Sequence, residues 1–429
     1  MGTRSGGLEG YFKLRERGSD VRTEVIAGFT TFMTMAYILF LNPLILGLVT
    51  DRDGLTLDPA SVLTVTALAA GITTIAMGAY ANYPFAIAAG LGLNGVVAFQ
   101  LVGASGLSWP EAMGVVVMEG IIILVLVLTK FRQAVMDSVP LPIKHSIAVG
   151  IGLFITIIGF VDAGFVTSTA QANPPLQLGT GNELRGWPIL IFIVGLLLMI
   201  VLFSRGVPGA LLIGILVTTV LAVIVNEAFL EGQGFGAAAN FGKIVDVPSG
   251  HNFSLIGDFS FGFIAELGII SAALAVFTLM LSDFFDTMGT AIGLGGEAKL
   301  LDQNGQLPDI DKVLQVDSAA AIVGGAFSSS SNTTYIESAS GIAAGGRTGL
   351  SAVVTGGLFL LSIFLSPLAV IIPFQAAAPA LVIVGFLMLR TVREIPWDDI
   401  ELAIPAFLTI VVMPFTYSIT NGIGAGFVS

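Results

Sequence analysis

Cysteine is absent from this 429-residue sequence, and histidine occurs only twice. Without cysteine the chain has no disulfide, no thiolate metal ligand and no cysteine nucleophile. Two histidines are too few for a histidine-based metal cluster. Charge is also scarce, because charged residues make up 11% of the chain against 55% hydrophobic residues. The mean hydropathy is +0.94. This composition excludes an ordinary soluble domain and is typical of a membrane protein with many spans.

Apolar runs of about twenty residues, enough to cross a bilayer core of roughly 30 Å, divide the chain after Thr23. Segment 1–23 is polar and charged, which excludes a cleavable signal peptide. We expect a fourteenth span to begin at Gly422 and to be truncated at Ser429. The thirteen spans before it are expected at 24–41, 60–80, 84–102, 110–129, 143–161, 187–204, 207–227, 267–291, 313–327, 332–346, 348–372, 376–391 and 399–419.

The basic residues support this number of spans. With a cytoplasmic N-terminus, fourteen of the seventeen lysines and arginines fall on the inner side, and the exceptions are Arg52, Arg185 and Lys243. Basic residues in membrane proteins concentrate in cytoplasmic loops. The sequence therefore predicts a multi-pass protein of the inner or plasma membrane with its N-terminus inside. We expect the lipid bilayer as a partner and no nucleic acid.

Two pairs of short matches indicate an internal repeat. The sequence around Gly120 resembles that around Gly357, and the sequence around Gly150 resembles that around Gly385, at offsets of 237 and 235 residues. These offsets place span 4 on span 11 and span 5 on span 12. Because a shift of seven spans is odd, the second copy must be inverted in the membrane. Inverted repeats are characteristic of transporters with a binding site at mid-membrane.

Two polar segments interrupt the apolar spans, at 282–290 and 328–337, and they carry Asp283, Asp286 and Glu337. An ionisable group inside a membrane is costly and marks a functional site by default. Polar contacts between helices are the alternative explanation. Span 3, with Asn94 beside several glycines, and span 10 both lack the pattern of a regular helix. Broken spans mark binding sites in secondary transporters, so we expect these segments to form one substrate and ion site.

Several motifs resemble one known family. Segments 23–43, 90–94, 284–290, 333–342 and 345–350 are similar to the AzgA-like purine permeases. These belong to the nucleobase–cation symporter-2 group, also called nucleobase–ascorbate transporters. The resemblance covers essentially the whole chain. It implies a secondary active transporter that imports adenine, guanine or hypoxanthine by proton symport through alternating access, and not an enzyme.

The resemblance also implies an all-α polytopic fold of fourteen spans, built as a seven-plus-seven inverted repeat. Spans 3 and 10 would each contain a short strand. A core domain would comprise 24–130 and 267–372, and a gate domain 131–227 and 373–429. The cytoplasmic segment 1–23 would precede them, and 228–266 would form an extracytoplasmic loop.

By motif match, Asp286 and Glu337 are implied to bind both the base and the coupled proton. The rest of the substrate-binding set would be Asn94, Thr333 and Tyr335. Supporting roles fall to Asp283, Glu119 and Phe285. No catalytic residue, metal or cofactor is expected. The coupling ion would be a proton, with sodium as the alternative, and a homodimer is left open.

Two alternatives compete with this function. A uracil or xanthine permease of the sister branch would share the site acids, although the first span favours the AzgA branch. An intramembrane metal-dependent enzyme is the rival from another class, with Asp283 and Asp286 as metal ligands. The chain has no second aspartate-rich motif and no accompanying basic cluster, which argues against that enzyme.

Overall fold

Helices make up most of the protein in the computed structural model, which describes residues 7–129, 141–169, 175–235, 238–240, 242–302 and 307–429. The strands are β1 (Ile87–Ala89), β2 (Val166–Ser168), β3 (Leu176–Leu178) and β4 (Asn332–Thr334). The α-helices are α1 (Leu8–Tyr11), α2 (Val21–Met35), α3 (Ile38–Leu46), α4 (Pro59–Ala76), α5 (Leu91–Gly95), α6 (Trp109–Leu128), α8 (Leu141–Asp162), α9 (Trp187–Ser204), α10 (Ala210–Phe229), α11 (Phe263–Leu267), α12 (Ile269–Glu297), α13 (Ile310–Ala326), α14 (Ser338–Ala343), α15 (Gly349–Leu361), α16 (Leu368–Ile371), α17 (Phe374–Leu389), α18 (Ile400–Thr416) and α19 (Ile419–Val428). Two π-helices are η1 (Met77–Ala81) and η2 (Val96–Ala104). Three 3₁₀-helices are η3 (Gly250–Phe253), η4 (Ser362–Leu365) and η5 (Arg390–Glu394).

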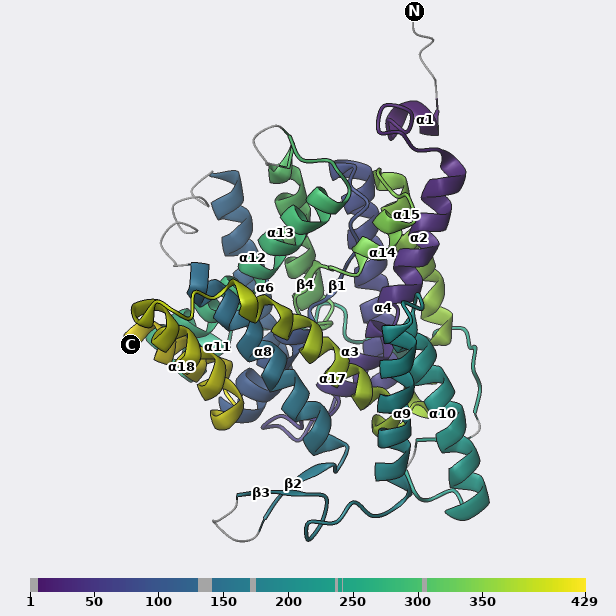
Figure 1. Ribbon diagram of the computed structural model, residues 1–429, viewed down its shortest axis with the longest axis vertical. Coiled ribbons are helices and arrows are strands. Elements are labelled where there is room, and N and C mark those ends of the chain that lie inside the picture. The colour runs from purple at the N-terminus through teal and green to yellow at the C-terminus, as the bar shows by residue number, and fades with distance from the viewer. Residues whose placement is uncertain (1–6, 130–140, 170–174, 236–237, 241, 303–306) are drawn as a thin grey trace, which may run out of the picture.

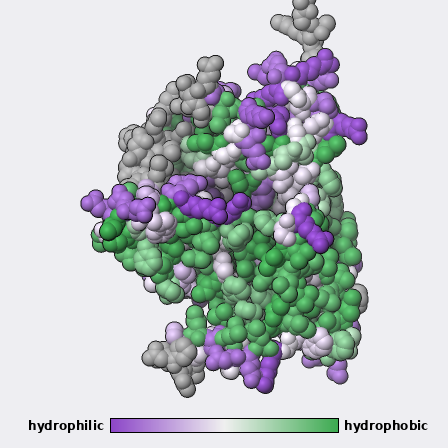
Figure 2. All heavy atoms as spheres, viewed as in Figure 1, coloured by the Kyte–Doolittle hydropathy of each residue, from purple (hydrophilic) through white to green (hydrophobic). Residues whose placement is uncertain are grey.

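Each expected span coincides with one or more of these elements. Eight helices in the described residues are long and apolar enough to cross a membrane, and three shorter apolar helices accompany them. The prediction of a polytopic helical membrane protein is therefore confirmed. The apolar residues cover a broad area of the visible face, with hydrophilic residues gathered above and below it (Figure 2).

Local sequence explains where several of the long helices begin. Asp58 accepts a hydrogen bond from the backbone N–H of Ser61 at the start of α4, and Pro59 occupies the first turn. Ser108 and Glu111 form a capping box at the start of α6. Such caps satisfy backbone N–H groups that the helix leaves unpaired. These positions fix the helix starts that the apolar runs predicted.

The helices pack in two groups. In one group α15 packs on α2 and α4, while α6 packs on α12 and α13. In the other, α8 packs on α17 and α18, while α9 packs on α10 and α17. A shift of seven spans exchanges the α6–α13 pair with α15–α4, and α8–α18 with α17–α9. The packing thus repeats as the inverted repeat requires.

Helices α4 and α15 come into close backbone contact within the first group. A Cβ added to Gly349 would lie 2.0 Å from the carbonyl oxygen of Gly78, and one on Gly356 would lie 2.6 Å from that of Gly71. At these two positions a side chain would collide with the backbone of α4 or of η1, which continues it, so glycine allows the close approach. The first repeat and the second are therefore locked together on this side.

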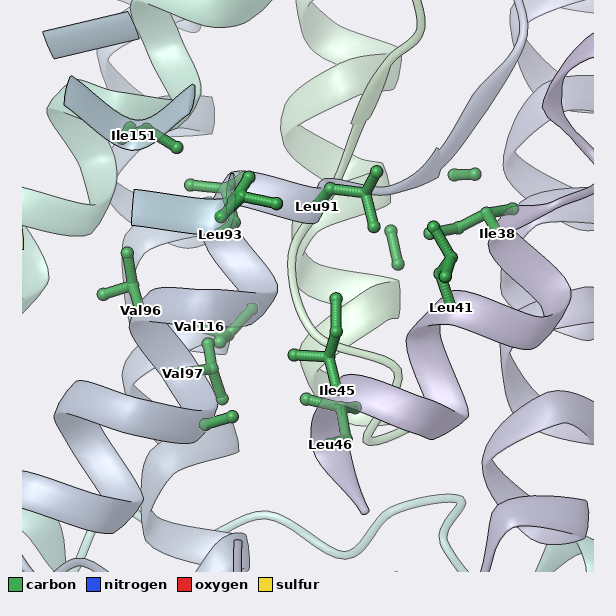
Figure 3. Close-up of a cluster of buried hydrophobic side chains, with 14 of the residues drawn as sticks. Ile38, Leu41, Ile45, Leu46, Leu91, Leu93, Val96, Val97, Val116 and Ile151 are labelled. Carbon is green, nitrogen blue, oxygen red and sulfur yellow. The ribbon is translucent and has the colours of Figure 1, made fainter. Parts of the chain in front are cut away.

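Strands β1 and β4 lie at the centre of the molecule (Figure 1). They pair antiparallel, with Ala88 opposite Thr333. The prediction of short strands in spans 3 and 10 is confirmed. After β1 the chain continues into α5, where Leu91 packs toward Ile38 and Leu41, and Leu93 lies near Ile151 of α8 (Figure 3). The broken span is thus anchored by its own leucines.

Two features lie between the expected spans. Segment 228–266, expected as an extracytoplasmic loop, contains η3 and most of α11 and is bound to the first helix group. The N–H of Ser260 donates to the carbonyl of Pro110 at 2.7 Å, and that of Gly257 to Ala326 at 2.7 Å. The hairpin of β2 and β3, with Thr167 opposite Gln177, was not predicted.

Candidate functional site

The break in span 10 begins with a serine-rich turn. Ser328 and Ser330 have positive φ angles of 53° and 72°, which is uncommon for residues with a side chain. Between them, the carbonyl of Ser329 accepts a hydrogen bond from the Asn42 amide at 3.0 Å. Asn42 also donates to Thr66 at 2.7 Å. Backbone strain of this kind clusters at functional sites, where the surrounding structure holds it in place.

Side chains fix the two short strands in their positions. Thr74 of α4 contacts both the N–H and the carbonyl of Ile87, each at 2.9 Å. Tyr335 lies directly after β4, and its hydroxyl donates to the carbonyl of Ala89 at 2.5 Å. The hydroxyl of Ser338 accepts from the N–H of Ala86 at 3.0 Å. The Tyr335 side chain is therefore already occupied in holding β1 against β4.

Helix α12 presents its two aspartates to different surroundings. Asp283 is completely buried, with a relative exposure of 0%. Asp286, one turn later, is exposed, as are Gly289 and Gly293 further along the helix. A Cβ on either glycine would meet no other atom within 4 Å. A carboxylate does not face hydrocarbon without a large cost. This half of α12 therefore borders an accessible space.

Glu337 lies at the start of α14 and is partly exposed. Its Oε1 accepts a hydrogen bond from the hydroxyl of Tyr37, at the junction of α2 and α3. Asp286 interacts electrostatically with Glu337. The two acids that the motifs singled out are thus neighbours, although they are separated by about fifty residues in the sequence.

The two polar segments meet through threonines. The Thr287 hydroxyl donates to Asp317 Oδ2 at 2.7 Å and lies 2.7 Å from the Thr333 hydroxyl. Because a hydroxyl has only one proton, Thr333 must be the donor to Thr287. The other oxygen of Asp317 accepts from the N–H of Thr334 at 2.9 Å and from its hydroxyl at 2.7 Å. These bonds join α12, α13 and β4.

Asn94 and Glu119 are both completely buried. Neither side chain has a hydrogen-bond partner among the described residues. An amide such as Asn94 both donates and accepts, which suits a planar heterocycle with ring N–H groups and acceptor nitrogens. Glu119 lies on α6, beside Ser331 and Asp317. The side chain of Phe285 lies outside the described residues.

Three residues of the site were not found from the sequence: Tyr37, Thr287 and Asp317. Asp317 carried a usable signal, because it is an acid inside the apolar stretch of α13 and the rule for intramembrane acids applies to it. Thr287 has no such signal, since intramembrane threonines are common in helix contacts. Tyr37 is visible only through its bond to Glu337.

A compact contact joins the two helix groups beside the site. A Cβ on Gly92 would lie 2.7 Å from Ile151 Cγ2, and one on Gly95 would lie 3.3 Å from the Phe154 ring. Phe99 of η2, Phe154 of α8 and Tyr417 after α18 form an aromatic cluster with ring centroids 5.1–6.3 Å apart. We call these three rings the aromatic contact.

Within the described residues, no three histidine, aspartate or glutamate side chains are arranged to hold a metal ion. The accessible carboxyl groups can accept hydrogen bonds from a bound solute. The buried amide of Asn94 can both donate and accept them. Backbone groups at the ends of β1 and β4 add further donors and acceptors. The arrangement suits a small, planar, hydrogen-bonding solute.

Comparison with known proteins agrees with this description. Residues 22–424 match the model of the Permease family. The adenine permease AdeP of Escherichia coli is 41% identical over 99% of this chain and 89% of its own length. The guanine/hypoxanthine permease PbuG of Bacillus subtilis is 38% identical over 98% of this chain and 92% of its own. In fold, the transmembrane domain of a cyanobacterial bicarbonate transporter, BicA, aligns with a TM-score of 0.66 at 17% identity, covering 95% of this chain and 97% of that one.

Proposed function

The chain belongs to the Permease family and is a transporter, not an enzyme, and from this premise we propose that it imports purine nucleobases by proton symport. The observation that carries the proposal is the pairing of Asp286 and Glu337, two acids that are both accessible and close together at the broken spans. Relatives named as adenine and guanine/hypoxanthine permeases support the substrate class.

The base would lie against the ends of β1 and β4, between Asn94 on one side and the two acids on the other. A purine presents ring N–H donors and acceptor nitrogens along one edge. A carboxylate accepts from two adjacent donors, and a protonated carboxyl group also donates. Asp286 and Glu337 are therefore assigned jointly to the base and the proton. Thr333 and Tyr335 contribute the backbone of the segment that the base contacts.

Transport would proceed by movement of one helix group against the other. We assign α2–α6 and α12–α15 to a core that carries the site, and α8–α10 and α17–α19 to a gate. With the N-terminus cytoplasmic, α12 runs inward from Ile269 to Glu297. Its exposed Asp286, Gly289 and Gly293 then form a path to the cytoplasm, while the aromatic contact closes the outer side. Alternation between this inward-open arrangement and an outward-open one would deliver the base to the cytoplasm.

The two alternatives fare differently. The metal-dependent enzyme is wrong, because the relatives are permeases and because Asp283 is buried while Asp286 is exposed, so they do not share a ligand position. A uracil or xanthine permease would have the same acids. The relatives at about 40% identity are named for adenine and for guanine/hypoxanthine, which favours the purine branch.

The test is uptake of labelled adenine, guanine, hypoxanthine and uracil into cells that lack their own base transporters, with and without a protonophore. We expect purine uptake that the protonophore abolishes. Glu337→Gln should remove high-affinity uptake at unchanged surface expression, because the amide cannot act as a carboxylate acceptor. Glu401→Gln, an exposed glutamate on α18, is the matched control. Uptake by Glu337→Gln with the parent kinetics would refute the site, and uptake of uracil alone would refute the purine assignment.

A further inference from the structure

A second group of acids lies inside the protein, apart from the accessible pair. Glu119 of α6 and Asp283 of α12 are both 0% exposed, and Asp317 of α13 is 4% exposed. The three carboxyl groups interact electrostatically with one another. None of the ion pairs in the described part of the chain includes any of them. This interior group therefore has no basic partner there to neutralise it.

Asp317 differs from the other two in being fully hydrogen-bonded. Three donors reach its oxygens, namely the hydroxyl of Thr287 and the N–H and hydroxyl of Thr334. Hydrogen bonds of this kind stabilise the charged form of a carboxyl group. Asp317 is thus the member of the group that is built to carry a negative charge.

Glu119 and Asp283 have the opposite surroundings. No oxygen of either carboxyl group has a hydrogen-bond partner among the described residues. A buried charge without a partner is strongly disfavoured, and a like charge nearby makes it worse. With Asp317 charged beside them, these two groups cannot both be ionised. The pair must therefore hold at least one proton.

The threonines indicate where a proton lies. Asp283 lies beside the hydroxyl of Thr333, whose proton is already donated toward Thr287. A hydrogen bond from Asp283 to the Thr333 oxygen would therefore need the acid form of Asp283. On the other side, the Ser331 hydroxyl next to Glu119 has no partner among the described residues and is free to donate. Glu119 is thus the member that a donor can support when charged.

We propose that Glu119 and Asp283 form a proton-binding pair, separate from the acids that face the base, and that the coupled proton taken up at Asp286 and Glu337 is held on this interior pair during transport. This inference rests on the proposed function. The pair would hold two protons when the carrier is loaded and one after release. Thr333 links the two sites, because it touches the pair through Asp283 and belongs to the strand that the base contacts. Proton binding and base binding would then favour one another.

Few other charged groups bear on this pair. From the elements packed against it, Asp317 of α13 and Asp286 of α12 face it. Within α6, α12 and α13 the one cation is Lys312, which pairs with Asp309 at the start of α13. Arg52, from the segment before α4, pairs with Glu111 in the first turn of α6. The proton on the pair therefore responds to the state of the two aspartates.

The first measurement needs no substrate. Infrared spectra of the purified protein in lipid nanodiscs, recorded across pH, should show protonated carboxyl groups whose signal decreases in Glu119→Gln and in Asp283→Asn. An amide keeps the shape of a protonated carboxyl group, so both variants should fold. Glu401→Gln should leave the signal unchanged. Equal signals in all four proteins would overturn the pair, whether or not the protein carries purines.

The second measurement concerns coupling. One linked proton changes the affinity for adenine by about tenfold per pH unit in the responsive range. Glu119→Gln should keep adenine binding and base exchange in proteoliposomes while flattening this dependence and losing accumulation driven by a pH gradient. An unchanged pH dependence, or accumulation by the parent protein under a sodium gradient alone, would overturn the proposal. Failure of the parent to bind any purine would instead refute the proposed function, and the infrared result would still decide the pair.

Discussion

The close contact between Gly92 of α5 and Ile151 of α8 offers a direct test of the alternating movement. We expect Gly92→Val to destabilise the arrangement described above, in which the outer side is closed. A Cβ at this position would lie 2.7 Å from Ile151 Cγ2, which is well inside van der Waals contact. Two further methyl groups would have no room between the helix groups. The substitution should therefore push the core and the gate apart on the outer side.

The size of the effect follows from this overlap. Inserting extra carbon atoms into a packed contact costs about 1–3 kcal/mol. Because roughly 1.4 kcal/mol corresponds to a factor of ten in an equilibrium constant, the ratio of outward-open to inward-open protein should rise by about 5- to 150-fold. Overall folding should change less, since separation of the two groups relieves the overlap. The substitution should therefore shift the equilibrium from the inward-open to the outward-open state without reducing the amount of folded protein.

The assay uses the absence of cysteine. A single cysteine replaces Ile336, which is 50% exposed beside Glu337, and an impermeant thiol reagent is added outside intact cells. The cysteine should react slowly in the parent and faster, within the stated range, in Gly92→Val. Gly289→Val is the matched control, because a Cβ there meets no atom within 4 Å. Equal rates in the parent and in Gly92→Val, or the same increase in the control, would show that this contact does not close the outer side.

Two further predictions concern topology and stability. A cysteine at Lys312 should be protected from an impermeant reagent in intact cells while one at Gln233 reacts, because the 297–312 loop is expected inside; the reverse pattern would overturn the orientation. Glu24→Gln should lower the melting temperature in detergent, because the buried Glu24 carboxylate accepts from the N–H groups of Arg347 at 2.9 Å and of Thr348 and Ser351 at 3.3 Å. Weakening such charge-assisted bonds costs about 1–3 kcal/mol, whereas Glu227→Gln, at an exposed position, should melt like the parent.

The broken spans could be predicted from the sequence because their residues are unsuited to a regular helix inside a membrane. Glycines around Asn94 and hydroxyl residues around Thr333 are poor material for a long membrane helix. The chain there forms the short helix α5, directly after β1, and the strand β4. The same logic applied to Asp317 would have completed the interior group of acids. Local composition reveals a site wherever the bilayer penalises the residues that form it.

Other features depend on contacts between distant segments, which a single sequence does not contain. The spacing of Asp283 and Asp286 predicts nearby helical faces, yet the boundary between the buried and accessible sides of α12 runs between them. The bond of Tyr37 to Glu337 and the contact of Gly92 with Ile151 likewise arise only from packing. For the same reason the β2–β3 hairpin and α11, which lie outside the spans, were not foreseen.

The glycine contacts between α4 and α15 have a thermodynamic consequence for accumulation. Backbones in contact at Gly78 and Gly349 favour a proposed core whose two halves move together. A core that travels as one rigid body keeps the same base contacts on both sides of the membrane. Intrinsic affinity for the base would then be equal at the two faces, and, like any passive carrier, the protein by itself would only equalise concentrations. Under the proposed symport, an uphill gradient would come from the ion bound with the base, and its steepness would be limited by the electrochemical potential of that ion.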